Sequence, residues 1–335
     1  MGIFPAGRNQ VALYFESGTW GTVSGAVIWP GQVTSLDATT NENIARQRYI
    51  GTASRNVDRF TPLAKDVPFT LEFIPQDWRM LGFAMGSVFT HTTGSPSPPV
   101  THQISEASAI ELNGVTSGTF CPHFSFTLEE LKQFNSTGLN INKQIQGCTV
   151  DSMDISATEG DFVNVSVNGI AKNIIYTSGT GATLVELTNP RPFLWKDGFF
   201  ALPSGTTNVI NGVKSWTWRM SNNLATKHYT GTGSRTADAL IPTERDYEVE
   251  LTMDAMSQHY KTFHDAYVSG TSFNLYQEIV QNTGSNYLNI WMSGCVVDSM
   301  TDPVTAEGLN EVSVTILPET CSASAADSID LYTPW

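Results

Sequence analysis

Histidine, the side chain that most often binds metals or transfers protons near neutral pH, occurs six times in this chain of 335 residues. A zinc site built on one helix needs two histidines on the same face, as in an HExxH motif. His259 and His264 are five residues apart, about 140° around a helix, so they do not share a face. No spacing among the six predicts a metal site; the six are His91, His102, His123, His228, His259 and His264.

Phosphate-binding and nucleophilic motifs are also missing. The sequence GTGSR at 231–235 resembles a phosphate-binding loop, but it lacks the Lys-Ser/Thr that completes one. There is no GxSxG nucleophile motif. Carboxylates are common, yet none forms a recognisable acid-base pair. We therefore expect no catalytic residue, no cofactor and no bound metal.

The four cysteines show no zinc spacing either. Cys148 and Cys295 each follow a glycine and occupy the same position in two related segments, which predicts small apolar residues in equivalent buried strands. Cys121 and Cys321 have no such counterparts, and a disulfide between them stays open.

A long internal repeat organises the chain. Residues 33–86 align with 213–266 at an offset of 180, with 14 identities in 54 positions and no gap. Residues 125–167 align with 272–314 at an offset of 147. The difference of 33 residues places an extra loop in the first copy, between about 88 and 124. A period of this size indicates a domain duplication, not a solenoid.

The repeat predicts two tandem domains, 1–175 and 176–335, the second ending in a tail at about 319–335 that we expect to dock on a sheet edge or on a partner. Alternating apolar residues in 67–73 and 247–253 predict strands with one packed face. The spacing of Met256, Tyr260, Phe263 and Tyr267 predicts a helix capped by Asp254, with its aromatic stripe in the core. In the first copy Gln76, Met80, Phe83 and Ser87 are the equivalents, with Pro75 in the first turn.

A long polar arm lies between strands in each copy, at 41–62 and 221–242. Long loops in compact domains are commonly functional. The residue types kept in both arms therefore predict contacts between subunits or between rings of subunits, and the alternative is that each arm wraps its own sheet. The six residues are Tyr49, Arg55, Asp58, Tyr229, Arg235 and Asp238.

The overall charge of −14 argues against an ordinary nucleic-acid-binding protein, because phosphate backbones are gripped by clustered Lys and Arg. Such a surface repels DNA, although it also simply favours solubility. No run of 18 apolar residues predicts a membrane span, and the opening residues MGIFPAGRNQ lack the apolar core of a secretion signal.

The chain resembles the tail tube proteins of long-tailed phages and archaeal tailed viruses. The resemblance rests on an N-terminal strand running into ESGTWGT at 16–22, a β-rich domain with one flanking helix, the long arm and the duplication. It implies a mainly β fold, a β-sandwich or barrel with a flanking helix, present as two tail-tube-like domains. It also implies homotrimeric, pseudo-hexameric rings that stack into the tail tube of the virion, assembled in the host cytoplasm.

The implied partners are other copies of the chain, the tail tip or baseplate, the tail terminator, the tape measure protein, and genomic DNA passing through the lumen without specific binding. Two other functions remain open. A β-sandwich adhesin or carbohydrate-binding module of a virion fits the Thr- and Asn-rich strands, and an enzyme would require a polar cluster in a cleft.

Overall fold

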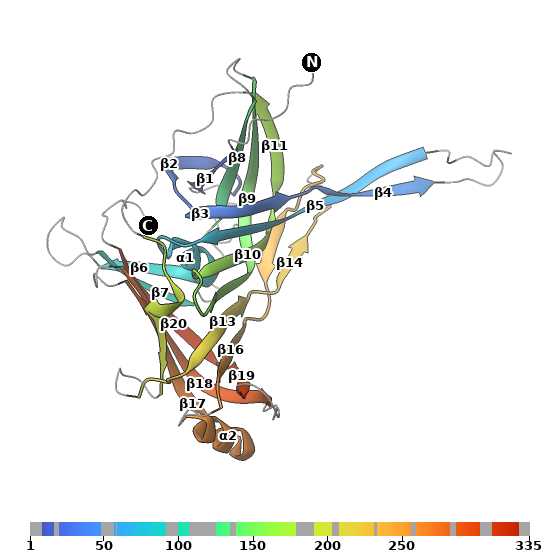
Figure 1. The fold of residues 1–335 in the computed structure, drawn as a ribbon. Helices are drawn as coiled ribbons and strands as arrows, with labels where there is room; N and C mark the ends of the chain where they lie inside the picture. Colours follow the sequence, from blue (N-terminus) through green and yellow to red (C-terminus); the bar gives the residue numbers. More distant parts are fainter. Residues whose placement is uncertain are drawn as a thin grey trace.

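The computed structural model describes residues 9–16, 20–47, 57, 59–91, 100–106, 125–134, 139–178, 191–202, 208–230, 233–255, 259–281, 286–301 and 310–327. Antiparallel strands dominate it, so the expectation of a mainly β fold is confirmed (Figure 1). In chain order the elements are β1 (Asn9–Glu16), β2 (Val23–Ile28), β3 (Gln32–Ala38), β4 (Asn41–Gln47), β5 (Arg59–Ile74), α1 (Arg79–Met85), β6 (Gly86–His91), β7 (Val100–Glu106), β8 (Phe126–Phe134), β9 (Leu139–Thr158), β10 (Asn164–Ala171), β11 (Asn173–Ser178), η1 (Trp195–Asp197), β12 (Gly198–Ala201), β13 (Val213–Ser221), β14 (Leu224–Lys227), β15 (Ala239–Pro242), β16 (Asp246–Asp254), α2 (Tyr260–Ser269), β17 (Phe273–Val280), β18 (Tyr287–Thr301), β19 (Glu311–Leu317) and β20 (Thr320–Asp327).

One sheet, called here the inner sheet, runs through both halves of the chain in the order β3-β5-β10-β9-β13-β16-β19-β18. Along each strand the side chains point alternately to the two faces of the sheet, and every second residue is apolar. Val67, Phe69, Leu71 and Phe73 are all at most 3% exposed, as the sequence predicts, while the residues between them face away from the core. The inner sheet therefore has one apolar face and one polar face.

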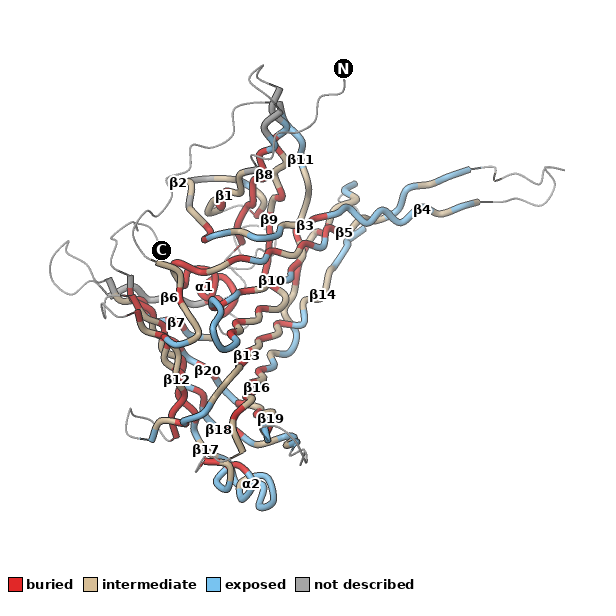
Figure 2. The backbone as a smooth tube through the Cα atoms, viewed as in Figure 1, coloured by how far each residue is buried: buried red, intermediate tan, exposed pale blue. Residues whose placement is uncertain are grey.

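Two outer sheets cover the apolar face, with strand orders β2-β1-β8-β9-β11 and β12-β17-β18-β20-β7-β6. The layers meet through aromatic contacts, such as the edge-on packing of Phe69 against Phe126 at 6.0 Å. Buried residues follow the inner strands of both halves (Figure 2).

The long strands β9 and β18 each belong to an inner and an outer sheet, because each bends at a glycine. Gly147 and Gly294 have φ angles of 71° and 65°, in the left-handed region that residues with a Cβ avoid. Each glycine lies in a bulge, because two residues of the bent strand there oppose one residue of its partner, Thr127 on β8 and Asn274 on β17.

The strand registers of the two halves coincide under the sequence offsets. Val33 pairs with Phe73 in the first half, and Val213 pairs with Met253 in the second, each next to a bulge. Likewise Val167 pairs with Met153, and Val314 pairs with Met300. The division into domains 1–175 and 176–335 stays a prediction, which these registers support.

The helices differ from the sequence prediction at their ends. Helix α2 begins only at Tyr260, so Asp254 does not cap it and instead ends β16; Met256 lies outside the described residues. Phe263 is buried, but Tyr267 is 47% exposed, so the prediction of a fully buried aromatic stripe is wrong. Helix α1 follows Trp78, which leaves Pro75 and Gln76 before it and Ser87 in β6.

The extra segment at 88–124 is not simply a loop. Residues 86–91 and 100–106 form the hairpin β6–β7, whose second strand pairs with β20. Within the tail at 319–335, residues 320–327 form β20, which docks on the edge of β18 and is flanked on its other side by β7. Cys148, Cys295 and Cys321 are buried free thiols, and Cys121 lies outside the described residues.

Candidate assembly surfaces

Three of the six predicted contact residues, Tyr49, Arg55 and Asp58, lie outside the described part of the chain. Their counterparts Tyr229, Arg235 and Asp238 lie in the segment between β14 and β15. Of the six residues, the structure therefore places only the three in the second arm.

Asp238 fixes the shape of the second arm. Its carboxylate accepts a hydrogen bond of 2.7 Å from the backbone N–H of Tyr229, and its own N–H donates to the carbonyl of Lys227 at 2.9 Å. The Tyr229 side chain is 47% exposed. Asp238 therefore orders the arm, and the aromatic ring of Tyr229 remains accessible to a neighbour.

Arg235 joins the second arm to the first within one chain. Its Nε donates to the carbonyl of Leu63 at 2.7 Å, and its guanidinium lies 3.5 Å from the Glu42 carboxylate. The backbone N–H of Lys65 donates to the Arg235 carbonyl at 2.8 Å. The second arm therefore lies along the base of the first, on the preceding half of the chain.

The first arm, formed by β4 and the first half of β5, projects away from the body as a two-stranded ribbon (Figure 1). Its strands carry the exposed apolar side chains of Ile44, Phe60 and Leu63, which are 52%, 60% and 48% exposed. A two-stranded ribbon has little core of its own in which to bury such groups.

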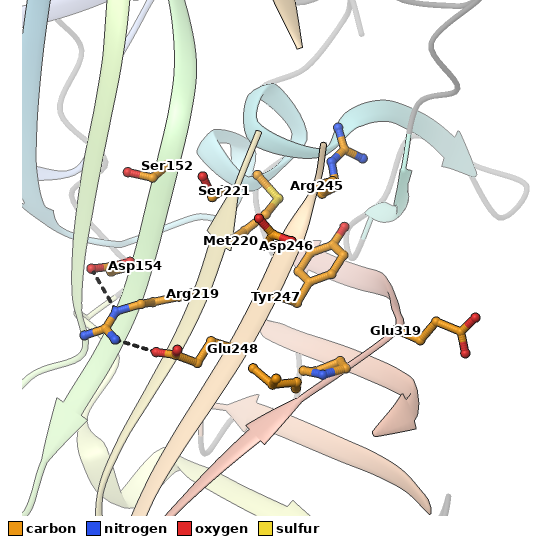
Figure 3. Close-up of a pocket in the computed structure, with 12 residues that line it drawn as sticks. Ser152, Asp154, Arg219, Met220, Ser221, Arg245, Asp246, Tyr247, Glu248 and Glu319 are labelled. Atoms are coloured by element: carbon orange, nitrogen blue, oxygen red, sulfur yellow. Dashed lines mark hydrogen bonds and ion pairs between the residues drawn. The ribbon is translucent and has the colours of Figure 1, made fainter. Parts of the chain in front are cut away.

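The two halves join by direct strand pairing of β9 with β13, here called the internal seam. Ser152 lies opposite Ser221, Asp154 opposite Arg219, and Thr158 opposite Ser215. On the polar face the Arg219 guanidinium lies 3.6 Å from the Asp154 carboxylate and 2.5 Å from that of Glu248 (Figure 3). A third carboxylate, that of Glu250, lies 3.4 Å from the same guanidinium.

Burial raises the pKa of the Asp154 carboxyl above its ordinary value, and Arg219 offsets part of that rise. These residues line part of a cavity of about 680 Å³ that is also bordered by Arg245, Asp246 and Glu319. Among the described residues no group of three or more His, Cys, Asp or Glu is arranged to hold a metal ion. The cavity is therefore lined largely by charged side chains from neighbouring strands.

Each end of the inner sheet is an open edge. Within the described residues, β3 pairs on this sheet with β5 alone, and the 296–301 part of β18 pairs with β19 alone. Unpaired N–H and C=O groups along such edges are ready to pair with another strand. In the described residues neither helix has the length and apolar character that crossing a lipid bilayer would take.

The sequence reasoning did not identify the internal seam or the open edges. The internal repeat could have identified both, because β13 is the counterpart of β3 and β9 is the counterpart of β18. A strand that is paired in one copy and unpaired in the other is a candidate interface.

A family model described as "Phage tail tube protein" matches residues 7–288 of the chain. No curated protein sequence matches it. Among solved structures, the chain is similar to the SPP1 tail tube, determined by solid-state NMR and cryo EM. That match has 12% identity and a TM-score of 0.31, and it covers 41% of this chain and 80% of that one.

Proposed function

The chain belongs to the phage tail tube protein family, a structural and not an enzymatic family, and we propose that three copies close into a ring of six sheet units. Such rings stack into the tail tube of the virion, the conduit for the genome. The two halves, 1–175 and 176–335, act as two tube domains fused in one chain. A closed ring leaves no inner-sheet edge exposed, which protects the protein from uncontrolled strand pairing.

The internal seam is the observation that carries this proposal. It joins the first half to the second by pairing β9 with β13. The counterparts of those strands, β18 and β3, are the two open edges. Joining β18 of one subunit to β3 of the next repeats the same junction, and three subunits give six junctions around a ring.

The register of the junction between subunits follows from the internal seam. Asp154 lies opposite Arg219 across the internal seam. At the repeat offset of 147 the counterpart of Asp154 is Thr301, and at the offset of 180 the counterpart of Arg219 is Thr39. Thr301 of one subunit therefore faces Thr39 of the next, and both side chains are exposed in the single chain.

Burial differs between the seam and the open edges in the way a missing neighbour predicts. Met153 and Trp216 at the internal seam are 1% and 3% exposed. Their counterparts Met300 and Leu36 at the open edges are only partly buried. A neighbouring subunit would remove this apolar surface from water and stabilise the ring.

The polar face of the inner sheet lines the channel in this arrangement. Cross-strand pairs keep polar residues on that face from β3 to β18. Its carboxylates outnumber its cations, and Arg219 is surrounded by three of them. This wall repels phosphate, so DNA passes without specific binding. The carboxylates on this face include Asp37, Glu72, Asp154, Glu248 and Glu250.

The arms connect neighbouring units and rings in this proposal. Arg235 already attaches the second arm to the preceding half of its own chain. The first arm, with exposed Ile44 and Phe60, has its contact surface on another subunit. The further partners are the tail tip or baseplate, the terminator and the tape measure protein, and assembly takes place in the host cytoplasm.

Charged residues introduced at the junction between subunits test the proposed ring. Thr301→Lys combined with Thr39→Arg places like charges opposite each other and should reduce assembly, because each such pair costs about 0.2–1 kcal/mol and a ring has three. Thr301→Asp combined with Thr39→Arg recreates the Asp154–Arg219 pair of the internal seam and should assemble like the unmodified protein. Sedimentation velocity measures the assembled fraction. Equal assembly of the two double variants would contradict the proposed register.

A further inference from the structure

The two helices occupy equivalent places but differ in burial. Phe83 of α1 packs on Phe126 of β8 at 4.8 Å, and Phe263 of α2 packs on Phe273 of β17 at 5.9 Å. Every residue of α1 is buried, whereas Phe263 is the single buried residue of α2. Figure 2 shows α2 exposed at one end of the molecule. What lies on the far side of each helix must therefore differ.

The second half of the chain covers α1. The Asn222 side chain donates a hydrogen bond of 3.0 Å to the carbonyl of Ala84, and the ring of Trp78, just before the helix, packs on Phe193 at 4.9 Å. The hairpin that follows α1 then pairs through β7 with the outer edge of β20. A neighbouring unit thus closes over both the helix and the strand edge.

Strand β11 is the counterpart of β20 in the first half. Ile174 pairs with Ile145 on β9, and Cys321 pairs with Met292 on β18, so the offset of 147 relates the two ladders. Within the described residues β11 pairs with β9 alone, and its other edge carries no strand. The edge of β20 is closed, and the edge of β11 is open.

The side chains on the two edges differ accordingly. Ile175 and Tyr176 of β11 are 36% and 67% exposed. At the corresponding positions β20 has the small residues Ser322 and Ala323, and Ala323, which pairs with Ile104 of β7, is 3% exposed. Large apolar groups in water at an open edge indicate a surface that another element covers.

Helix α2 supplies a matching surface. It has ten residues against seven in α1, and the extra C-terminal turn carries Tyr267 and Val268, which are 47% and 71% exposed. The chain then leads directly to β17, with no hairpin like β6–β7. In the first half the C-terminal end of the helix points to the hairpin that reaches β20. The same end of α2 therefore points to β11 of the next unit in a ring.

We infer that the last turn of α2 in one subunit packs on β11 of the next subunit, with Tyr267 and Val268 against Tyr176, which shares a face of its strand with the core-packed Ile174. This contact rests on the proposed ring and specifies its outer face. Between subunits it replaces the β7–β20 pairing that joins the outer sheets within a subunit. In such a ring the outer sheets meet in two different ways, three times each, whereas all six junctions of the inner sheets are alike.

Disulfide crosslinking of the assembled protein tests the contact. In a Cys121→Ser background, Val268→Cys combined with Tyr176→Cys should give bands of two and three chain masses on a non-reducing gel after mild oxidation. Lys261→Cys with Tyr176→Cys is the matched control. Lys261 is exposed on nearly the same face of α2 but about 10 Å nearer its N-terminus, beyond the reach of a disulfide to the same partner.

Rings that form without the Val268–Tyr176 crosslink, or that crosslink equally in the control, would overturn the contact and leave the ring intact. A crosslink from Tyr176→Cys to Leu331→Cys would overturn it in favour of the C-terminal segment as the occupant of β11. Failure of the background protein to form any ring would refute the proposed function itself, and the contact with it.

Discussion

Glu16, the first residue of the ESGTWGT motif, holds together the point where β9 bends, and replacing it should have a large effect. Its two carboxylate oxygens accept four hydrogen bonds. Two come from the backbone N–H groups of Gly21 and Gly147, at 2.8 and 2.7 Å. Two come from the hydroxyls of Ser125, at 2.6 Å, and Thr127.

Glu16→Gln keeps the shape but replaces one acceptor oxygen with an NH₂ group. The hydroxyls of Ser125 and Thr127 can rotate to accept, but the N–H groups of Gly21 and Gly147 cannot, so one of them loses its partner. An unsatisfied backbone donor costs about 1–3 kcal/mol, and weakening the remaining charge-assisted bonds adds about 1 kcal/mol. We expect a total loss of about 2–4 kcal/mol in the free energy of unfolding.

Urea unfolding of the unassembled protein, followed by tryptophan fluorescence, measures this loss, because Trp20 donates its indole N–H to the Gly147 carbonyl at 3.0 Å. Glu159→Gln is the control, since Glu159 is exposed and makes no such cluster, and it should change stability by less than about 0.5 kcal/mol. Equal unfolding midpoints for the two variants would refute the role assigned to Glu16.

Three other predictions test separate features. Arg235→Ala combined with Arg55→Ala should leave the chain folded but shorten tubes, because Arg235 holds the second arm to Leu63 and Glu42; unchanged tube lengths in negative-stain images would count against this role. Gly294→Ala should destabilise more than Gly160→Ala, by about 1 kcal/mol in urea unfolding. Both glycines have positive φ, but only at Gly294 would the added Cβ lie 2.6 Å from the Glu319 carboxylate, so only there does overpacking add to the cost. Burial raises the pKa of the Cys295 thiol from 9.0 to about 11. Between those pH values the thiol ionises in the unfolded chain only, so the free energy of unfolding should fall by at most about 1.4 kcal/mol per pH unit. Cys295→Ala should make this fall less steep, and an unchanged slope would contradict the prediction.

The sequence predicted the features that follow from local alternation and from the repeat. Alternating apolar residues placed Val67–Phe73 and Tyr247–Met253 correctly in strands with one buried face. The Gly-Cys pairs at 147 and 294 placed two cysteines in buried strands. These positions are predictable because a strand with one buried face has an apolar residue at every second position, so a few neighbouring residues reveal it.

Features set by distant contacts were not predictable in the same way. The β6–β7 hairpin exists because β20 offers an edge more than 200 residues further along, so its own Pro- and Ser-rich sequence indicated a loop. Tyr267 fits the helical period of a buried stripe, but it is 47% exposed, and no helix or strand in the described part of the chain covers it. The contact of Arg235 with the first arm likewise depends on how the two halves join.

Family membership favours a tube protein over the adhesin or carbohydrate-binding alternative. The observations that bear on assembly are the paired internal seam and the two unpaired edges that correspond to it.

A cryo-EM reconstruction of the assembled protein tests this account most directly. It should contain rings of three chains in which β18 of each subunit pairs with β3 of the next, Thr301 opposite Thr39, with the polar face of the inner sheet toward the channel. A ring with another number of chains, or with β3 and β18 at its surface and not paired to each other, would contradict it.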